Sequence, residues 1–442
     1  MRSLRALLFL GFSTTLQAQI AAMPPMGWNS WDSYGLSITE TESKQNADWL
    51  AAHLKVDGWQ YVVVDQGWYV QNPEAKPGAF RFTMSADGRY QPAVNRFPSA
   101  TSDAGFKPLA SYVHSLGLRF GIHVIRGIPR GAVARDLPIA GSPYHAAQAA
   151  DRTDTCPWNA DNFGVKDNAA GQAYYNSVAQ LYANWGVDFV KVDCIAAHPY
   201  KGDEIRMLSQ ALRKVGRPML LSLSPGPAPL NKAAELIQWA QMWRISDDVW
   251  DHWAHDKKLN FSQSVLEQFP VAASWSKYGG DGHWPDADML PIGYLGPRPG
   301  EGTARQSKLT HDEQQTLMTA WAIFRSPLFI GGNLTKTGSS TLALLTNREV
   351  LAVNQRATGQ HQVMNDGRQA VWLSKQPAGN GVYVALFNLS DSEESLRYPL
   401  QSLGLGKTLF AVRDLWAQRD LIRSDQLKVK LAPHTSALYL VR

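Results

Sequence analysis

The feature that most constrains the fold is a regular alternation of short apolar runs with amphipathic stretches along most of the 442-residue chain. β-Branched and aromatic residues fill the runs, which predicts buried strands. The intervening segments have helical spacing, as in 39–59, where Thr39 is a candidate N-cap, and in 106–117, which ends at Gly117. Strands are predicted at 25–31, 61–65, 118–124, 187–193, 219–224, 242–246, 287–292 and 326–332.

About eight strand-helix units favour a closed (β/α)8 TIM barrel over an open doubly wound sheet. No GxGxxG motif follows the first predicted strand, which weakens a dinucleotide-binding interpretation. Near residue 350 the pattern changes to short alternating strands separated by Gly, Asn and Asp turns. We therefore expect a catalytic barrel over 19–350 and a C-terminal antiparallel β-sandwich over 351–442.

The N-terminus has the order of a secretory signal peptide over residues 1–18. Arg2 and Arg5 precede an apolar run at 6–12, and small or polar residues follow it. This run is too short to span a membrane, and no longer apolar stretch follows. We expect export to the periplasm or the outside of the cell, without a membrane span.

Charge and cysteine content restrict the function further. The net charge of +5 is spread without a basic tract, which argues against nucleic acid as a partner. Cys156 and Cys194 are the only two cysteines. In an exported protein such a pair can form a disulfide, and the alternative is two buried thiols.

Polar residues end several of the predicted strands. In a TIM barrel the active site lies at the C-terminal ends of the strands, so these residues are the first candidates for chemistry. They are Asp65 and Gln66, His123, Lys191 and Asp193, Ser224, and Arg244 with Asp247 and Asp248.

Two carboxyl groups beside a sugar are the usual requirement for glycoside hydrolysis, and tryptophans such as Trp28, Trp31 and Trp68 could pack against the sugar. Lys191 and Asp193 lie two residues apart on one strand and face the same way, so the ammonium group would help to keep Asp193 ionised as a nucleophile. Asp248 is the candidate proton donor. Spacing alone leaves Asp247, and the acidic pair Asp286 and Asp288, as competing assignments. The sequence lacks GxSxG, HExxH and phosphate-loop motifs, and we expect neither a metal nor a cofactor.

Seven blocks make the chain resemble glycoside hydrolase family 27, which contains α-galactosidases and α-N-acetylgalactosaminidases. They are PPMGWNSW, TCPWN, FVKVDC, WRISDDVW, GHWPDADMLPIG, AIFRSPLFIGGNL and NREVLAVNQ, and they occur in the family's order. The resemblance implies a retaining double displacement with Asp193 as nucleophile and Asp248, rather than Asp247, as acid/base. It also implies a sugar pocket with Trp31, Asp65, Lys191 and Arg244, and a disulfide between Cys156 and Cys194.

Three positions depart from the α-galactosidase pattern. Gln66 replaces the second of two aspartates that hold the sugar's 4- and 6-hydroxyls, Ser224 replaces a Glu near the 2-hydroxyl, and His123 replaces a Tyr. We count all three as substrate-binding positions. Such changes in buried polar groups can redirect specificity between sugars.

The leading hypothesis is an exo-acting α-galactosidase that acts on oligo- or polysaccharides. The alternatives are the same mechanism on an isomaltosyl, β-L-arabinopyranosyl or α-N-acetylgalactosaminyl glycon, and, from another class, a carbohydrate-binding protein without catalysis. Three arginines at 125–135 indicate either an anionic substrate or pairing with acidic side chains.

Overall fold

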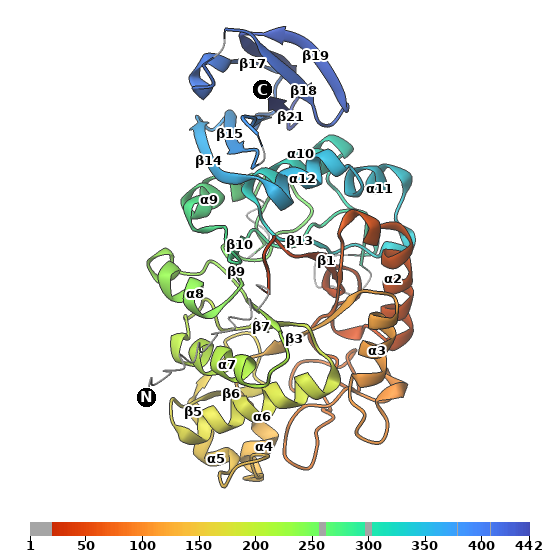
Figure 1. Ribbon diagram of the computed structural model, residues 1–442. Coiled ribbons are helices and arrows are strands. Elements are labelled where there is room, and N and C mark those ends of the chain that lie inside the picture. Colours follow the sequence, from red (N-terminus) through yellow and green to blue (C-terminus); the bar gives the residue numbers. More distant parts are fainter. Residues whose placement is uncertain (1–19, 256–261, 297–302, 378, 407) are drawn as a thin grey trace, which may run out of the picture.

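The computed structural model describes residues 20–255, 262–296, 303–377, 379–406 and 408–442. The predicted signal peptide at 1–18 lies outside the described residues. The described chain forms a ring of strands surrounded by helices, and a separate group of antiparallel strands beyond α10 and α12 (Figure 1).

Eight parallel strands form the central sheet in the order β10-β9-β8-β7-β3-β2-β1-β13. A parallel bridge between Leu290, just after β10, and Ile330 in β13 joins the two edges. This confirms the predicted TIM barrel. The strands are β1 (Met26–Asn29), β2 (Tyr61–Val64), β3 (Arg119–Ile125), β7 (Phe189–Asp193), β8 (Leu220–Leu223), β9 (Met242–Arg244), β10 (Trp284–Asp286) and β13 (Leu328–Ile330).

The seventh strand differs from the prediction. It spans Trp284–Asp286, whereas the apolar run at 287–292 was expected to form it. Asp288 has a φ of 82°, a left-handed conformation that interrupts an extended strand. The run 287–292 is nevertheless buried, as its apolar sequence implied, and contributes Leu290 to the bridge that closes the barrel.

Helices surround the barrel (Figure 1). Thr39 caps α2, as the sequence predicted, and it forms a reciprocal capping box with Glu42. None of the helices in the described ranges is long and apolar enough to cross a membrane. The helices are α1 (Trp31–Tyr34), α2 (Glu40–His53), α3 (Lys107–Ser115), α4 (Arg130–Ala134), α5 (Ala146–Ala149), α6 (Ala169–Trp185), α7 (Gly202–Lys214), α8 (Ala233–Trp239), α9 (Gln268–Trp275), α10 (His311–Phe324), α11 (Ser339–Leu345) and α12 (Arg348–Arg356).

The interior of the barrel is a packed core. Its side chains come mainly from the first residues of the strands, including Tyr61, Leu220 and Trp284. The N-terminal segment closes this end, because Ala21 belongs to the same cluster and its carbonyl oxygen accepts a 2.8 Å hydrogen bond from Trp284 Nε1. A filled interior leaves only the opposite, C-terminal end of the strands open for chemistry.

Two small sheets accompany the barrel. The first, in the order β4-β6-β5, follows β3 in the chain, and its strand β5 ends next to Cys156. The second is the hairpin of β11 and β12. Their strands are β4 (Ile128–Pro129), β5 (Ala150–Thr155), β6 (Asn162–Val165), β11 (Tyr294–Leu295) and β12 (Arg305–Gln306).

The C-terminal part has a six-stranded antiparallel sheet in the order β14-β15-β16-β21-β18-β19, faced by the pair β17-β20. One face of the large sheet packs against the barrel helices, where Trp372 contacts Phe324 and Phe387 contacts Phe269. The other face, with Val384 and Leu386, packs toward β17 and β20. This confirms the predicted β-sandwich. Its strands are β14 (Thr358–Asn365), β15 (Gln369–Lys375), β16 (Val382–Asn388), β17 (Glu394–Pro399), β18 (Phe410–Asp414), β19 (Arg419–Ser424), β20 (Gln426–Leu431) and β21 (Ser436–Val441).

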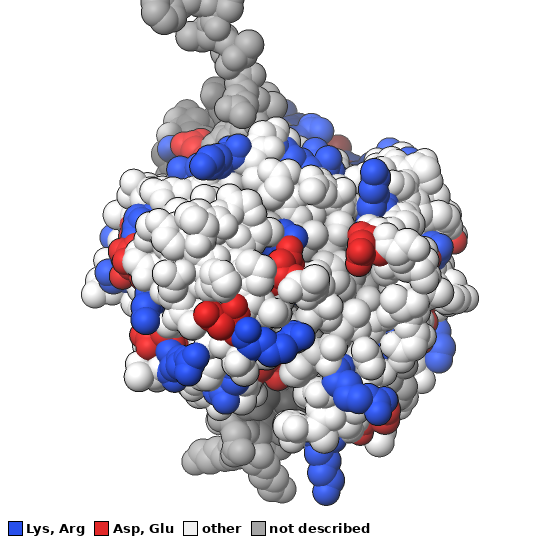
Figure 2. Space-filling model, turned by 90° about the horizontal axis from the view of Figure 1, so that it is seen from below, with Lys and Arg blue, Asp and Glu red and all other residues white. Residues whose placement is uncertain are grey.

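The surface carries charges of both signs. On the face shown in Figure 2, lysine and arginine side chains are interspersed with acidic ones and do not form one large patch.

Candidate active site

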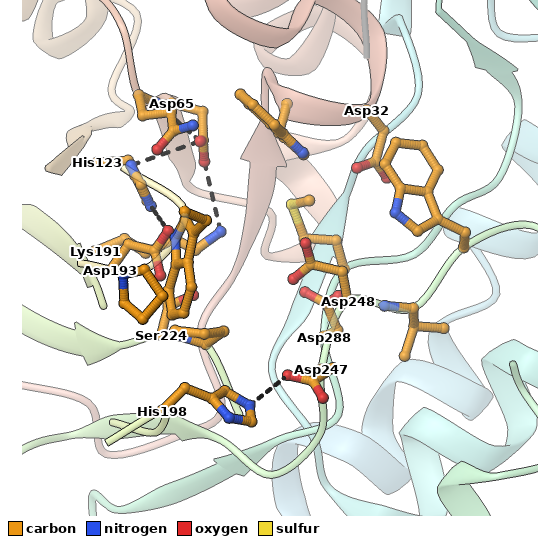
Figure 3. Close-up of a pocket in the computed structure, with 18 residues that line it drawn as sticks. Asp32, Asp65, His123, Lys191, Asp193, His198, Ser224, Asp247, Asp248 and Asp288 are labelled. Atoms are coloured by element: carbon orange, nitrogen blue, oxygen red, sulfur yellow. Dashed lines mark hydrogen bonds and ion pairs between the residues drawn. The ribbon is translucent and has the colours of Figure 1, made fainter. Parts of the chain in front are cut away.

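A pocket of about 500 Å³ opens at the C-terminal ends of the barrel strands. Its wall includes eight of the predicted site residues, namely Trp31, Asp65, Gln66, His123, Lys191, Asp193, Ser224 and Asp248. Figure 3 shows their arrangement. The remaining lining residues are Asp32, Pro157, Trp158, His198, Pro225, Asp247, Val249, Trp250, Asp288 and Met289.

Asp65, which directly follows β2, forms the floor of the pocket and is held ionised. Its Oδ2 accepts a 2.7 Å hydrogen bond from Asn29 Nδ2 and lies 3.5 Å from Lys191 Nζ, while Oδ1 accepts from the Gln66 amide at 2.8 Å. Burial opposes the charge, but His123, Lys191 and these hydrogen bonds outweigh it and lower the pKa of Asp65. The floor therefore offers a fixed anionic acceptor for sugar hydroxyls.

His123 on β3 links the floor to Asp193 (Figure 3). Its Nδ1 lies 3.6 Å from Asp65 Oδ1, and its Nε2 lies 3.8 Å from Asp193 Oδ2. Burial lowers the pKa of His123 more than the neighbouring carboxylates raise it. In its neutral form the imidazole can donate a hydrogen bond through one ring nitrogen and accept one through the other.

Asp193 ends β7 and points into the pocket. The backbone amide of Cys194 donates a 2.6 Å hydrogen bond to its Oδ1. Burial and the nearby Asp248 raise the pKa of Asp193 despite the opposing effects of His123 and Lys191. The Lys191 ammonium thus acts to lower the pKa of Asp193, as predicted, but the ion pair of Lys191 is with Asp65.

Arg244, at the end of β9, lies behind the pocket wall and holds two carboxylates. Its Nη2 lies 3.2 Å from Asp248 Oδ1, and its Nη1 lies 2.7 Å from Asp288 Oδ1. Arg244 is fully buried and is not among the residues that line the pocket. The structure therefore brings it to the back of Asp248 and not to the sugar-facing surface.

The three acidic residues that sequence spacing left as competing catalytic assignments occupy different environments. Asp286 is buried outside the pocket wall, and burial raises its pKa to about 7. Asp288 lines the pocket, but Arg244 and the Val249 amide occupy its two oxygens. Asp247 lies 3.1 Å from His198 Nε2, and burial raises its pKa.

Sequence reasoning missed Asp32, which lies beside Trp31 on the pocket wall. Asp32 is 1% exposed, and its Oδ2 has no hydrogen-bond partner among the described residues. Burial, reinforced by Asp288, raises the pKa of Asp32 well above its usual range. Its position next to Trp31 after the first strand was the signal that could have revealed it.

Two of the three tryptophans suggested for sugar packing are not available to a ligand. Trp28 and Trp68 are fully buried, and their indole N–H groups donate to the carbonyl oxygens of Gly332 and His123. Trp31 does line the pocket, and Trp158 and Trp250 join it there. Composition and position near a strand end did not distinguish core tryptophans from pocket tryptophans.

The predicted disulfide between Cys156 and Cys194 is present. It joins the loop after β5 to the residue that follows Asp193. Arg126 supports the same region, because its Nε donates to the Cys194 carbonyl oxygen and its guanidinium pairs with Asp154 and Glu204. Arg126 is therefore paired with acids and does not face an anionic substrate.

Comparison with known proteins agrees with this geometry. The α-galactosidase A family model matches residues 161–356, and the α-galactosidase C-terminal β-sandwich model matches 366–441. The crystal structure of a family 27 β-L-arabinopyranosidase from Geobacillus stearothermophilus is 47% identical, covers 96% of this chain and 97% of that chain, and superimposes with a TM-score of 0.91. The chain belongs to glycoside hydrolase family 27.

Two further relatives show the range of this family. A structure from Bacillus halodurans C-125, provisionally named an α-N-acetylgalactosaminidase, is 41% identical over 95% of this chain and 96% of that chain, with a TM-score of 0.83. The α-galactosidase of Oryza sativa subsp. japonica is 26% identical over 95% of this chain and 84% of its own length. This family 27 protein is thus a glycoside hydrolase of the α-galactosidase type that acts on carbohydrate.

Proposed function

We propose that the protein is an exo-acting, retaining β-L-arabinopyranosidase. The observation that carries this proposal is the 47% identity to the Geobacillus β-L-arabinopyranosidase over nearly the whole of both chains, against 26% to the rice α-galactosidase. The earlier expectation of an α-galactosidase becomes the second candidate. A β-L-arabinopyranosidase and an α-galactosidase both share this fold, and the choice between the two glycons depends on one substituent.

A β-L-arabinopyranoside has the ring configuration of an α-D-galactoside but lacks the hydroxymethyl group. In the α-galactosidase pattern an aspartate after Asp65 binds the hydroxyl of that group. Gln66 stands there in this chain, and its buried Oε1 has no hydrogen-bond partner among the described residues. A neutral amide is a weaker acceptor than a carboxylate, so binding of the hydroxymethyl group contributes less here.

The proposed mechanism uses Asp193 and Asp248 as the two carboxyl groups of a double displacement. The Asp193 carboxylate attacks the anomeric carbon while the bond to the leaving oxygen breaks and Asp248 gives that oxygen its proton. Asp248 then takes a proton from water, whose oxygen attacks the anomeric carbon and releases Asp193. The Cys194 amide fixes the orientation of Asp193, and Arg244 holds Asp248.

The second candidate, an α-galactosidase, is favoured by Asp65. This residue keeps the charged acceptor that the α-galactosidase pattern uses for the sugar, with a lowered pKa and a full set of polar contacts. An α-galactoside would therefore keep its contacts with Asp65. Its hydroxymethyl group would lack the contact with a second aspartate, because Gln66 stands at that position.

A screen of p-nitrophenyl glycosides tests the glycon. We expect kcat/KM to be highest for the β-L-arabinopyranoside, lower for the α-D-galactopyranoside and lowest for the α-N-acetylgalactosaminide. A higher kcat/KM for the galactoside would refute the first candidate in favour of the second. Binding of these sugars without turnover of any glycoside would instead identify a carbohydrate-binding protein.

Two variants test the mechanism. Asp193→Ala and Asp248→Ala should each lower turnover by several orders of magnitude on the best substrate, since each removes one of the two carboxyl groups. Asp203→Ala, which removes an exposed carboxylate at the start of α7, is the matched control and should keep full turnover. Normal turnover in either folded active-site variant would contradict the assignment.

We also propose that residues 1–18 direct export to the periplasm or the outside of the cell. The Cys156–Cys194 bridge is consistent with this location, because exported compartments permit disulfides to persist. N-terminal sequencing of the protein recovered from outside the cytoplasm tests this location and the cleavage site.

A further inference from the structure

The side chains of the pocket are ordered by depth. Asp65 and His123 are each 3% exposed, Asp193 is 15% exposed, Asp248 is 37% exposed and His198 is 48% exposed. Figure 3 places Asp65 and His123 at one end of the pocket and His198 with Asp247 at the other. If Asp193 and Asp248 flank the scissile bond, the cleaved sugar lies toward Asp65 and the leaving group lies toward His198.

The mouth carries an exposed aromatic side chain. Trp158 lines the pocket and is 46% exposed, whereas most tryptophans that the structure describes are buried or half-buried. A large apolar ring left in water beside a catalytic pocket is a typical contact for a ligand. Its flat face suits the C–H face of a sugar ring.

This aromatic rim is held in place. The Trp158 and His198 rings meet edge to face, with centroids 6.2 Å apart and planes at 80°. The Nε2–H of His198 is shared between the carbonyl oxygen of Gly226 at 3.0 Å and Asp247 Oδ1 at 3.1 Å. The disulfide ties Cys156, two residues before Trp158, to the loop that carries His198. A rim fixed in this way loses little conformational entropy when a ligand binds.

The charges at the mouth favour a neutral ligand. Asp247 is acidic and lies 3.1 Å from His198 Nε2, so its carboxylate would repel an anionic sugar. A carboxylate next to an aromatic ring provides an acceptor for hydroxyl groups together with an apolar face. This combination matches an uncharged pyranose or furanose.

We propose that Trp158, His198 and Asp247 form a subsite that binds a neutral sugar residue in the leaving group. The natural substrate is then an oligosaccharide or polysaccharide branch whose penultimate unit is an uncharged sugar. The inference rests on the proposed placement of Asp193 and Asp248, and it holds for either candidate glycon.

The test compares two substrates with the glycon that the aryl-glycoside screen selects. One is the glycosyl fluoride, which has no leaving-group ring, and the other is a disaccharide with a neutral second sugar. Trp158→Ala should lower kcat/KM on the disaccharide by about tenfold and leave the fluoride unchanged within about twofold. Trp158→Phe keeps an aromatic face and should restore most of the disaccharide activity.

A matched control exists on α2, where the rings of Trp49 and His53 contact each other away from the pocket, with centroids 4.5 Å apart. Trp49→Ala should leave the ratio of the two kcat/KM values unchanged. An equal loss on both substrates in Trp158→Ala, or no loss on either, would overturn the subsite. No turnover of either substrate by the unaltered enzyme would instead refute the proposed function.

Transglycosylation gives a second readout. With the glycosyl fluoride as donor and a free neutral sugar as acceptor, the acceptor must occupy the leaving-group side before it attacks the glycosyl-enzyme. The unaltered enzyme should form the disaccharide, and Trp158→Ala should form about tenfold less of it relative to hydrolysis. Equal partitioning in the two enzymes would contradict the inference.

Discussion

The disulfide should stabilise the barrel and keep Asp193 in its working position. The two cysteines are separated by 38 residues in sequence. In the loop-closure description, a crosslink over such a span lowers the entropy of the unfolded chain by an amount that stabilises the fold by about 4 kcal/mol. Replacement of both cysteines in Cys156→Ser/Cys194→Ser should therefore lower the free energy of unfolding by up to this amount.

Activity should fall by a separate route. The Cys194 amide orients Asp193, and the Cys194 carbonyl is held by Arg126, so these contacts persist without the bridge, although the loop is less restrained. We expect kcat to fall by about tenfold or less, since the peptide group that orients the carboxylate stays in place.

Urea unfolding, followed by tryptophan fluorescence and by residual activity, measures both effects. Dithiothreitol should move the transition of the unaltered protein to that of the double variant, and should leave the variant itself unchanged. Identical transitions for the bridged and unbridged proteins would refute the entropic argument. Loss of all activity at unchanged stability would show instead that the bridge acts mainly on the site.

Two further predictions concern single side chains of the pocket. Gln66→Asp should raise the ratio of α-galactosidase to β-L-arabinopyranosidase kcat/KM by about tenfold, because a carboxylate is the stronger acceptor for the hydroxymethyl group; an unchanged ratio would mean that Gln66 does not limit galactoside recognition. Burial raises the pKa of Asp32 above its usual 3.8, so the folded state retains a proton that the unfolded chain releases, and stability falls as the pH rises from about 3.8 through the folded pKa. The side chain of Asp32→Asn cannot ionise. The melting temperature of this variant should therefore exceed that of the unaltered protein by an amount that grows over this pH range and vanishes near pH 3.8. A difference that is constant at all pH values would contradict the raised pKa.

Much of the barrel follows from local pattern. The strand Tyr61–Val64 is an apolar run buried on both faces, and it is bounded by the polar residues Gln60 and Asp65. The seventh strand was placed wrongly because the run at 287–292 is equally apolar and buried. What separates it from a strand is the left-handed backbone of Asp288, which sequence pattern does not reveal.

The candidate site was partly predictable for a similar reason. Residues that end strands, such as Asp65 and Asp193, could be found by position, since parallel strands bring their ends together. Trp158 and His198 lie in loops that only the three-dimensional fold brings to the pocket mouth, and Arg244 lies at a strand end but behind the wall. Local pattern indicates which end of the barrel a residue occupies, and it does not indicate whether the residue faces the cavity.

The N-terminal segment that closes one end of the barrel has a practical consequence for handling the enzyme. Because the Ala21 carbonyl is anchored to Trp284 at the closed end of the barrel, an attachment point at Ala21 lies on the side opposite the substrate entrance. Immobilisation through that end would present the open mouth to solution. Large branched polysaccharides could then reach the pocket without steric interference from the support.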